Sequence, residues 1–182
     1  MSSKNKNLFN LVLSAMFLAL ALVLPLLTGQ LQSIGNALCP MHIPVILCGF
    51  FCGPIWGLLV GFIAPLLRFV IFGMPPIMPI GFAMAFELAT YGFMTGLLYK
   101  LLPKNTRVKH IVTIYASLII AMIAGRLVWG VVRAVIAGVT SAEFGMEAFL
   151  AGAFLNAIPG IILQIILIPV LVMAIKKAYK NQ

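Results

Sequence analysis

The stretch that decides the fold is PMHIPVILCGFFCGPIWGLLVGFIAPLLRFVIF, residues Pro40 to Phe72. It is almost wholly apolar, and it is too long for one membrane-spanning helix, which needs roughly 20 residues. Gly53-Pro54 interrupts it, because proline lacks the amide donor and its ring clashes with the preceding helical turn. The stretch therefore predicts a short helix over 40–52 and a longer one over 54–72.

Similar apolar runs lie on both sides of this stretch. Of the whole chain, 63% is apolar and 8% is charged, and the mean hydropathy is +1.18. A soluble domain is nearer half apolar and a quarter charged, so this composition cannot build a water-facing surface. We predict an all-α membrane protein with one integral domain over residues 1–182. Its six transmembrane helices are expected at about 8–28, 40–52, 54–72, 80–102, 110–138 and 148–175.

The basic residues predict the orientation of these helices. Nine of the 12 lie in the two tails or in the linker after the fourth predicted helix, namely Lys4, Lys6, Lys100, Lys104, Arg107, Lys109, Lys176, Lys177 and Lys180. The loops 29–39, 73–79 and 139–147 contain no Lys or Arg. Loops rich in Lys and Arg stay in the cytoplasm, so both termini are expected there. Because these charges flank apolar runs, the net charge of +9 indicates anionic membrane lipid rather than nucleic acid.

Four charged residues fall inside predicted helices: Arg68, Glu87, Arg126 and Arg133. A charge in hydrocarbon costs at least about 2.5–3.5 kcal/mol, so each one requires a partner, a water-filled cavity or a function. For Arg68 the alternative to a functional role is that its long side chain extends to the outer membrane–water interface. Glu87 has the alternative of pairing structurally with one of the other two arginines, which share a helix face. One carboxylate cannot neutralise both, and we hypothesise that the surplus positive charge receives an anionic group of a small ligand.

Two further polar residues are candidates for the same site. His42 lies between two prolines at the start of the second predicted helix, where it would cap the helix or line a pocket. A metal site formed with Cys39, Cys48 and Cys52 is a weaker interpretation, because their spacing is not diagnostic. Asn156 on the sixth predicted helix would bond a neighbouring helix or a ligand, and Gln164 presents the same two alternatives.

Several features limit the class of protein. Ala15 and Ala19 on the first predicted helix are one turn apart, and small residues at this spacing allow another helix to approach closely. The sequence contains no phosphate-binding loop of the G-x-x-x-x-G-K-[ST] type, no H-E-x-x-H, no G-x-S-x-G and no acidic metal cluster. We therefore expect neither ATP hydrolysis by this chain nor enzymatic activity, and no cofactor.

The chain resembles the substrate-binding S components of energy-coupling factor (ECF) transporters. The resemblance rests on six predicted helices, the Ala15-x-x-x-Ala19 spacing, and the segment from Met41 to Arg68. That segment has an H-I-P start, the Gly53-Pro54 break and a following glycine-spaced helix. This resemblance implies a bundle that captures a vitamin or similar small nutrient from outside the bacterial plasma membrane.

The resemblance also implies a mechanism and partners. A pocket between helices four to six would be capped by loops 29–39 and 73–79, and it would contain Glu87, Arg126, Arg133 and Asn156. The subunit would topple in the membrane while docked, through Ala15 and Ala19, to a transmembrane coupling protein with two cytoplasmic ATPases. The H-I-P start is similar to pantothenate-type members, and the carboxylate of pantothenate would suit the surplus arginine. Riboflavin, folate, pyridoxine and a queuosine precursor remain alternatives.

Three other classes compete with this interpretation. A stand-alone small-solute transporter or channel would work without ATPases. An integral membrane enzyme would need clustered acids or a nucleophile–base pair, and neither pattern is visible. A scaffold subunit without a ligand would leave the buried arginines unexplained.

Overall fold

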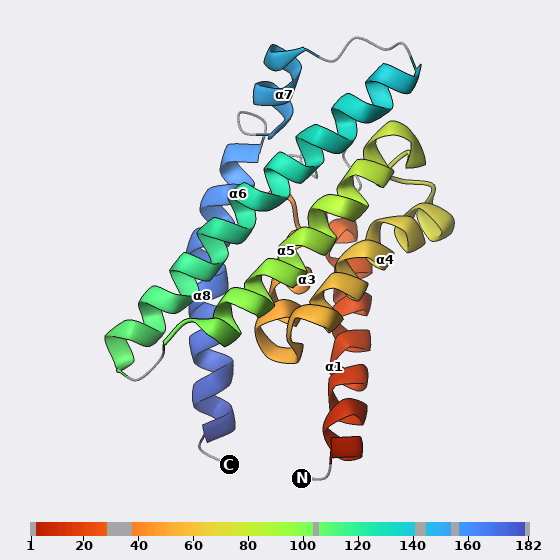
Figure 1. The fold of residues 1–182 in the computed structure, drawn as a ribbon. Coiled ribbons are helices and arrows are strands. Elements are labelled where there is room, and N and C mark those ends of the chain that lie inside the picture. Colours follow the sequence, from red (N-terminus) through yellow and green to blue (C-terminus); the bar gives the residue numbers. More distant parts are fainter. Residues whose placement is uncertain (1–2, 29–37, 104–105, 141–144, 154–156, 181–182) are drawn as a thin grey trace.

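The computed structural model describes residues 1–182 except 1–2, 29–37, 104–105, 141–144, 154–156 and 181–182 (Figure 1). Its described elements are α1 Ser3–Val23, η1 Leu24–Thr28, α3 His42–Cys52, α4 Pro54–Phe72, η2 Ile77–Gly81, α5 Phe82–Leu101, α6 Arg107–Thr140, α7 Met146–Ala153 and α8 Ile158–Lys180. No strand occurs among the described residues. The predicted all-α fold is therefore confirmed.

Five of the described helical segments are long and apolar enough to cross a membrane, and α3 is shorter. The count of six spans remains a prediction, since α3 has only 11 residues. The structure differs from the sequence prediction at the carboxyl-terminal end. A single helix was expected over 148–175, whereas α7 ends at Ala153 and α8 begins at Ile158. Pro159 lies in the first turn of α8, where a missing amide donor costs no hydrogen bond.

The break at Gly53-Pro54 has the predicted form. Gly53 has φ 95°, a left-handed value that favours glycine, and its amide donates to the carbonyl of Gly49 at 3.1 Å to close α3. Pro54 then begins α4. The stretch 73–79, expected as a loop or re-entrant turn, leads into the short π-helical turn η2 at Ile77, in which Met78 has the extended angles φ −114° and ψ 134°. The fourth predicted helix therefore begins with a distorted turn.

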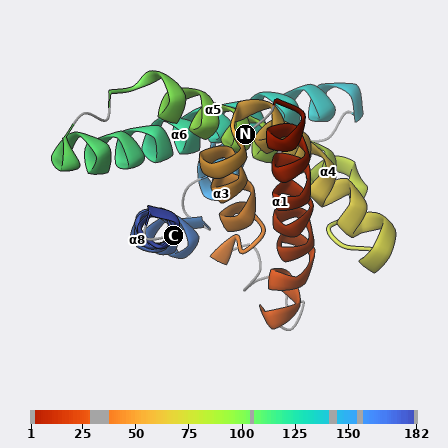
Figure 2. The same ribbon diagram turned by 90° about the horizontal axis from the view of Figure 1, so that it is seen from below.

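Helix α3 lies at the centre of the bundle. Ten of its 11 residues are buried, and it packs against α1, α4, α5 and α8. Seen from the end that holds the termini, α3 lies between α1 and α8 (Figure 2). A helix too short to span lipid is tolerated there, because protein rather than hydrocarbon surrounds it.

Helices α4 and α5 cross at glycines. A Cβ atom added to Gly92 would lie 2.1 Å from the carbonyl oxygen of Gly57, and one added to Gly61 would lie 2.3 Å from that of Leu88. These backbones therefore touch directly, and α5 is held firmly beside α4. This contact fixes the rotation of α5 and with it the direction in which its polar residues face.

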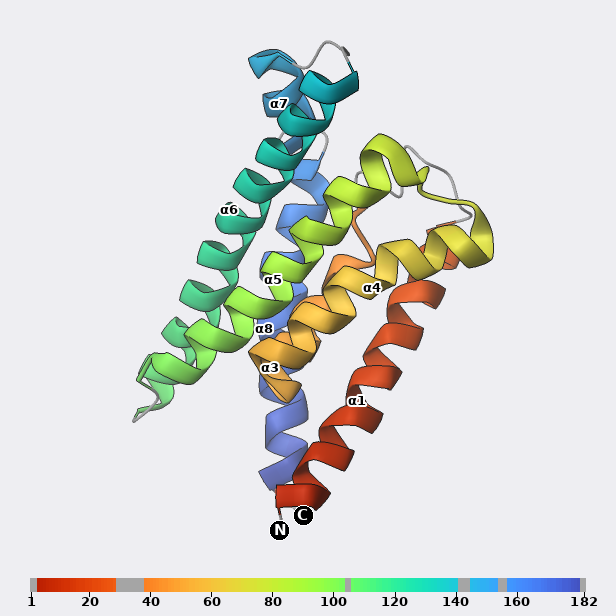
Figure 3. The same cartoon turned by 45° about the vertical axis from the view of Figure 1, so that its right-hand side comes forward.

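Both termini lie at one end of the bundle, together with the connection between α5 and α6 (Figures 1 and 3). The opposite end carries the connection from α4 to α5 and helix α7 (Figure 1). We refer to these two ends as the terminal end and the α7 end. Lys100 lies in the last turn of α5, at the terminal end. This arrangement agrees with the predicted one-sided distribution of basic residues.

Candidate functional site

The centre of the candidate site is the carboxylate of Glu87 on α5, which is 2% exposed. Its Oε1 atom lies 2.9 Å from Nη1 of Arg126 on α6, forming an ion pair. The hydroxyl of Tyr91 donates a hydrogen bond to the same oxygen at 3.0 Å. The Nε2 atom of His42 lies 3.6 Å from it, which is too long for a hydrogen bond. We call these four residues the Glu87 centre.

Local features of three helices bring the Glu87 centre together. Glu87 and Tyr91 lie one turn apart on α5 and so share a face. His42 begins α3, and its ring centroid lies 5.3 Å from that of Tyr91. A Cβ atom added to Gly125 would lie 2.2 Å from the Tyr91 ring. Only glycine lets α6 approach α5 here, and this approach brings the neighbouring Arg126 to Glu87.

Arg126 also contacts a second side chain, which is uncharged. Its Nη2 atom donates to Sγ of Cys39 at 3.8 Å. Burial raises the pKa of the Cys39 thiol, so the thiol stays protonated near neutral pH and supplies no compensating negative charge. The charge of Arg126 is therefore balanced by Glu87, and the pair is neutral as a unit.

The Glu87 centre retains polar atoms that could bind a ligand. Both ring nitrogens of His42 and the Nε atom of Arg126 are buried, and within the described part of the chain they have no hydrogen-bond partner. Buried polar atoms are normally satisfied, and leaving one unpaired costs about 1–3 kcal/mol. The arrangement is therefore suited to receive a polar group from outside the chain.

Arg133 lies toward the α7 end of α6 from Arg126. Its guanidinium carbon lies 5.8 Å from the centre of the Trp129 ring. Trp129 in turn stacks on Phe149 of α7, with 6.5 Å between ring centroids. Sequence reasoning left open which arginine pairs with Glu87, and the structure selects Arg126.

Arg68 has a different environment. It is 5% exposed, and its Nη1 atom donates to the carbonyl of Leu22 near the end of α1 at 2.9 Å. The guanidinium also lies 5.3 Å from the centre of the Phe72 ring. The side chain is thus packed against α1 rather than extended at the surface, and these contacts join α4 to α1. A ligand-binding role for Arg68 remains a prediction.

The remaining predictions concern Asn156, the docking residues Ala15 and Ala19, and the weaker interpretation of a metal site. Asn156 lies outside the described residues, so its position in the site is untested. Ala15 and Ala19 are exposed on α1, as a docking role would require. Among the described residues, no three His, Cys, Asp or Glu side chains gather where a metal ion could bind.

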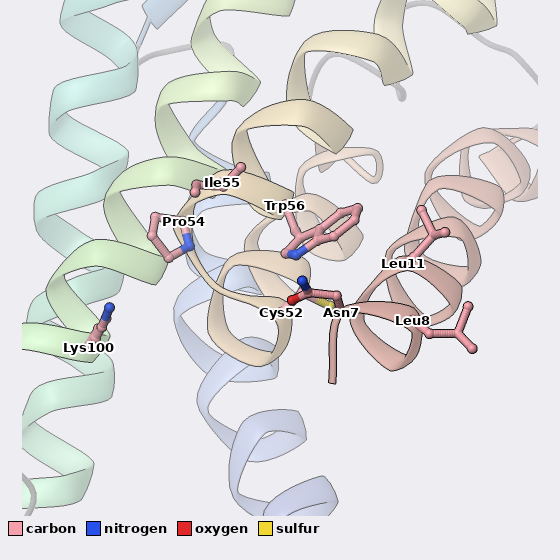
Figure 4. A pocket seen from close by; sticks show the side chains of 8 residues that line it. All are labelled: Asn7, Leu8, Leu11, Cys52, Pro54, Ile55, Trp56 and Lys100. Atoms are coloured by element: carbon pink, nitrogen blue, oxygen red, sulfur yellow. The ribbon is translucent and has the colours of Figure 1, made fainter. Parts of the chain in front are cut away.

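Two hollows accompany these features. One, of about 150 Å³, lies between α6 and α8 and is lined by Ile119, Met122, Ile123, Arg126, Ile161 and Ile165. We call it the α6–α8 cavity, and Arg126 is its charged residue. The other, of about 700 Å³, is lined by Asn7, Leu8, Leu11, Cys52, Pro54, Ile55, Trp56 and Lys100 (Figure 4). Lys100 places this second hollow, the α1–α4 hollow, toward the terminal end.

Two residues that shape the site, Tyr91 and Gly125, were not predicted from the sequence. Tyr91 could have been found, because it follows Glu87 by one helical turn and its hydroxyl can donate to a carboxylate. Gly125 carried no such signal, since glycine is common in membrane helices and its role depends on the position of the Tyr91 ring.

A helical, multi-pass membrane protein with a buried ion pair between its spans is the class that this fold and site define. Within that class, the family described as "ECF transporter, substrate-specific component" matches residues 9–172. The chain therefore belongs to this family, and the resemblance seen in the sequence is confirmed. No curated protein and no solved structure matches the chain.

Family membership establishes the general role. The chain is an S component that functions in uptake, and it is a transporter subunit rather than an enzyme. The prediction that it has no enzymatic activity is confirmed on this ground. Its role implies interaction with a substrate and with the energy-coupling module.

Proposed function

We propose that this S component captures a small nutrient at the Glu87 centre from outside a bacterial plasma membrane. The observation that supports this proposal best is the buried pair of Glu87 and Arg126, with His42 and Tyr91 directed at the same carboxylate. A purely structural ion pair would not require two ring nitrogens of a buried histidine to remain without hydrogen-bond partners among the described residues.

The geometry bears on the chemistry of the nutrient. Because Glu87 neutralises Arg126 at 2.9 Å, a carboxylate placed beside this pair would gain little net attraction and would face Glu87. The hypothesis of an anionic group therefore concerns Arg133, which lies seven residues away, about 10 Å along the helix. A nutrient such as pantothenate would direct its carboxylate to Arg133 and its neutral end to the Glu87 centre.

We further propose that α1 docks the subunit onto a transmembrane coupling protein that carries two ATPases. Ala15 and Ala19 are exposed and lie on the same helix face as Leu8 and Leu11, which line the α1–α4 hollow (Figure 4). Small side chains let a partner helix approach α1 closely. Toppling of the docked subunit, with both termini in the cytoplasm, would then expose the captured nutrient to the inside.

Mass spectrometry of small molecules that co-purify with the protein tests capture. We expect the wild type to carry a nutrient, and the double variant Glu87→Gln/Arg126→Met to lose it while remaining monodisperse. Thr90→Val is the control, because the Thr90 hydroxyl donates to the carbonyl of Phe86 in its own helix. Retention of the nutrient by the double variant would place the binding site elsewhere.

Uptake by cells tests docking. With the coupling protein and ATPases co-expressed, we expect Ala15→Val/Ala19→Val to lose uptake and co-purification of the coupling protein while still binding the nutrient. Met16→Val, at another exposed position of α1, should leave both unchanged. Uptake by the chain without any partner would support a stand-alone transporter instead.

A further inference from the structure

Gln164 on α8 is a polar side chain that the Glu87 centre does not explain. It is 1% exposed, and neither its Oε1 nor its Nε2 atom has a hydrogen-bond partner among the residues that the structure describes. A carboxamide that is buried with both ends unsatisfied is unfavourable in any folded protein. The NH2 group of Gln164 therefore has its hydrogen-bond donors unused, and the carbonyl oxygen beside it has its acceptor sites unused.

Gln164 lies beside two residues of α8 that line the α6–α8 cavity. Ile161 and Ile165, within one turn of Gln164 on either side, line the α6–α8 cavity together with Arg126. The Nε atom of Arg126 is itself unpartnered within the described chain. Helices α6 and α8 thus present unsatisfied polar atoms at neighbouring levels of the bundle, and α3 contributes those of His42.

The chemistry of these atoms restricts what they can bind. A carboxamide donates through Nε2 and accepts through Oε1, so its full complement is a neutral edge with a donor beside an acceptor, as an N–H beside a C=O provides. A carboxylate only accepts and an ammonium only donates, so either would leave one atom of Gln164 unsatisfied. The neutral Glu87–Arg126 pair also provides no net charge to attract an ion.

We infer that the captured nutrient presents a neutral amide-type edge, a carboxamide, lactam or ureide, to Gln164 beside the α6–α8 cavity that Arg126 lines. This inference rests on the proposed capture function and adds the class of substrate to it. Gln164 is then the residue that distinguishes nutrients with such an edge from nutrients of similar size without one. A ligand without such an edge would leave the buried polar atoms of Gln164 unpaired. A binding site of this kind therefore discriminates strongly against ligands that lack the matching groups.

The test uses purified protein in lipid nanodiscs and four stated probes. Riboflavin, folate and 7-deazaguanine carry an amide-type edge with an N–H beside a C=O, whereas pyridoxine does not. The probes are offered singly and as an equimolar mixture, and the retained compound is identified by mass spectrometry. We expect at least one amide-bearing probe to be retained, and pyridoxine to be washed away.

The matched variants are Gln164→Met, which keeps the length of the side chain without its polar atoms, and Leu163→Met. Leu163 is the neighbouring residue and is 37% exposed, so its variant controls for a new methionine on α8. We expect Gln164→Met to bind the retained probe about tenfold or more weakly, and to melt at an equal or higher temperature without probe. Leu163→Met should bind as the wild type does.

Each outcome decides between the two proposals. Retention of pyridoxine in preference to the amide-bearing probes would overturn the amide inference and leave capture intact. Equal affinity of Gln164→Met and wild type would do the same. Retention of no probe, together with no small molecule on the natively purified protein, would count against capture itself. If Gln164→Met does not fold, the probe preference of the wild type still decides.

Discussion

Replacing Arg126 by methionine would remove one charge of the buried pair and leave the carboxylate of Glu87 with only Tyr91 and His42 beside it. Glu87 is 2% exposed and Arg126 is 6% exposed, so the carboxylate would lose its compensating charge while it stays buried. We expect the single variant to be markedly destabilised. The double variant Glu87→Gln/Arg126→Met, in which no charge is left, should recover most of the lost stability.

The magnitude follows from the geometry. Two unit charges 2.9 Å apart attract by about 6 kcal/mol at an effective dielectric constant of about 20. Much of this offsets the cost of removing both charges from water, so the net value of the pair is small. Breaking it on one side costs about 3–5 kcal/mol, whereas neutral replacement of both sides is expected within about 1 kcal/mol of the wild type.

A double-mutant cycle measured by equilibrium unfolding in mixed micelles tests this expectation. The wild type, both single variants and the double variant are compared, and a coupling energy of about 3 kcal/mol or more between Glu87 and Arg126 is expected. Arg68→Met provides a matched control, because the polar contact of this equally buried arginine is with Leu22. Its effect should be additive with Glu87→Gln.

Two results would refute the reasoning. If the double variant were as unstable as Arg126→Met, the loss would come from packing around the side chain rather than from an unpaired charge. If Arg68→Met coupled to Glu87→Gln as strongly as Arg126→Met does, the effect would be a general property of buried arginines in this bundle.

Two other substitutions test the fold that supports the site. Gly92→Ala places a methyl group 2.1 Å from the carbonyl oxygen of Gly57, so it should force α4 and α5 apart and cost about 1–3 kcal/mol. Gly138→Ala, with nothing within 4 Å of the added Cβ, should be neutral or stabilising, and comparable unfolding of the two variants would contradict the close crossing. Tyr99→Phe removes the hydroxyl that accepts a hydrogen bond from Lys176 and lies 2.7 Å from Nε2 of His110. We expect a loss of about 1–2 kcal/mol and faster proteolysis near the terminal end, and an unchanged digestion pattern would argue against this link between α5, α6 and α8.

Much of the fold could be predicted because a bilayer imposes local rules. Apolar runs of sufficient length, the break at Gly53-Pro54 and the one-sided lysines are properties of short segments. The division of the last predicted helix into α7 and α8 was not predicted, because both parts are apolar and Pro159 is compatible with either a kink or a helix start.

The sequence could also identify the members of the site but not their pairing. A charge inside an apolar helix needs a partner wherever it lies, so Glu87 and the three arginines were recognisable individually. Their partners depend on helix rotation and separation. The close approach of α6 to Tyr91 at Gly125 and the packing of Arg68 against Leu22 are contacts between segments far apart in the chain, and spacing along one helix carries no information about them.

By itself, then, the sequence determined an all-helical membrane protein with basic residues gathered at one end and four charges inside its helices that require partners. The tertiary structure alone decided that Glu87 is shared by Arg126, Tyr91 and His42, and that the short α3 is enclosed by protein. The physical reason is that the free energy of transferring an apolar segment from water into the membrane depends on the composition of that segment alone. Ion pairs and hydrogen bonds depend on distances of a few ångströms between helices, which only their mutual packing fixes.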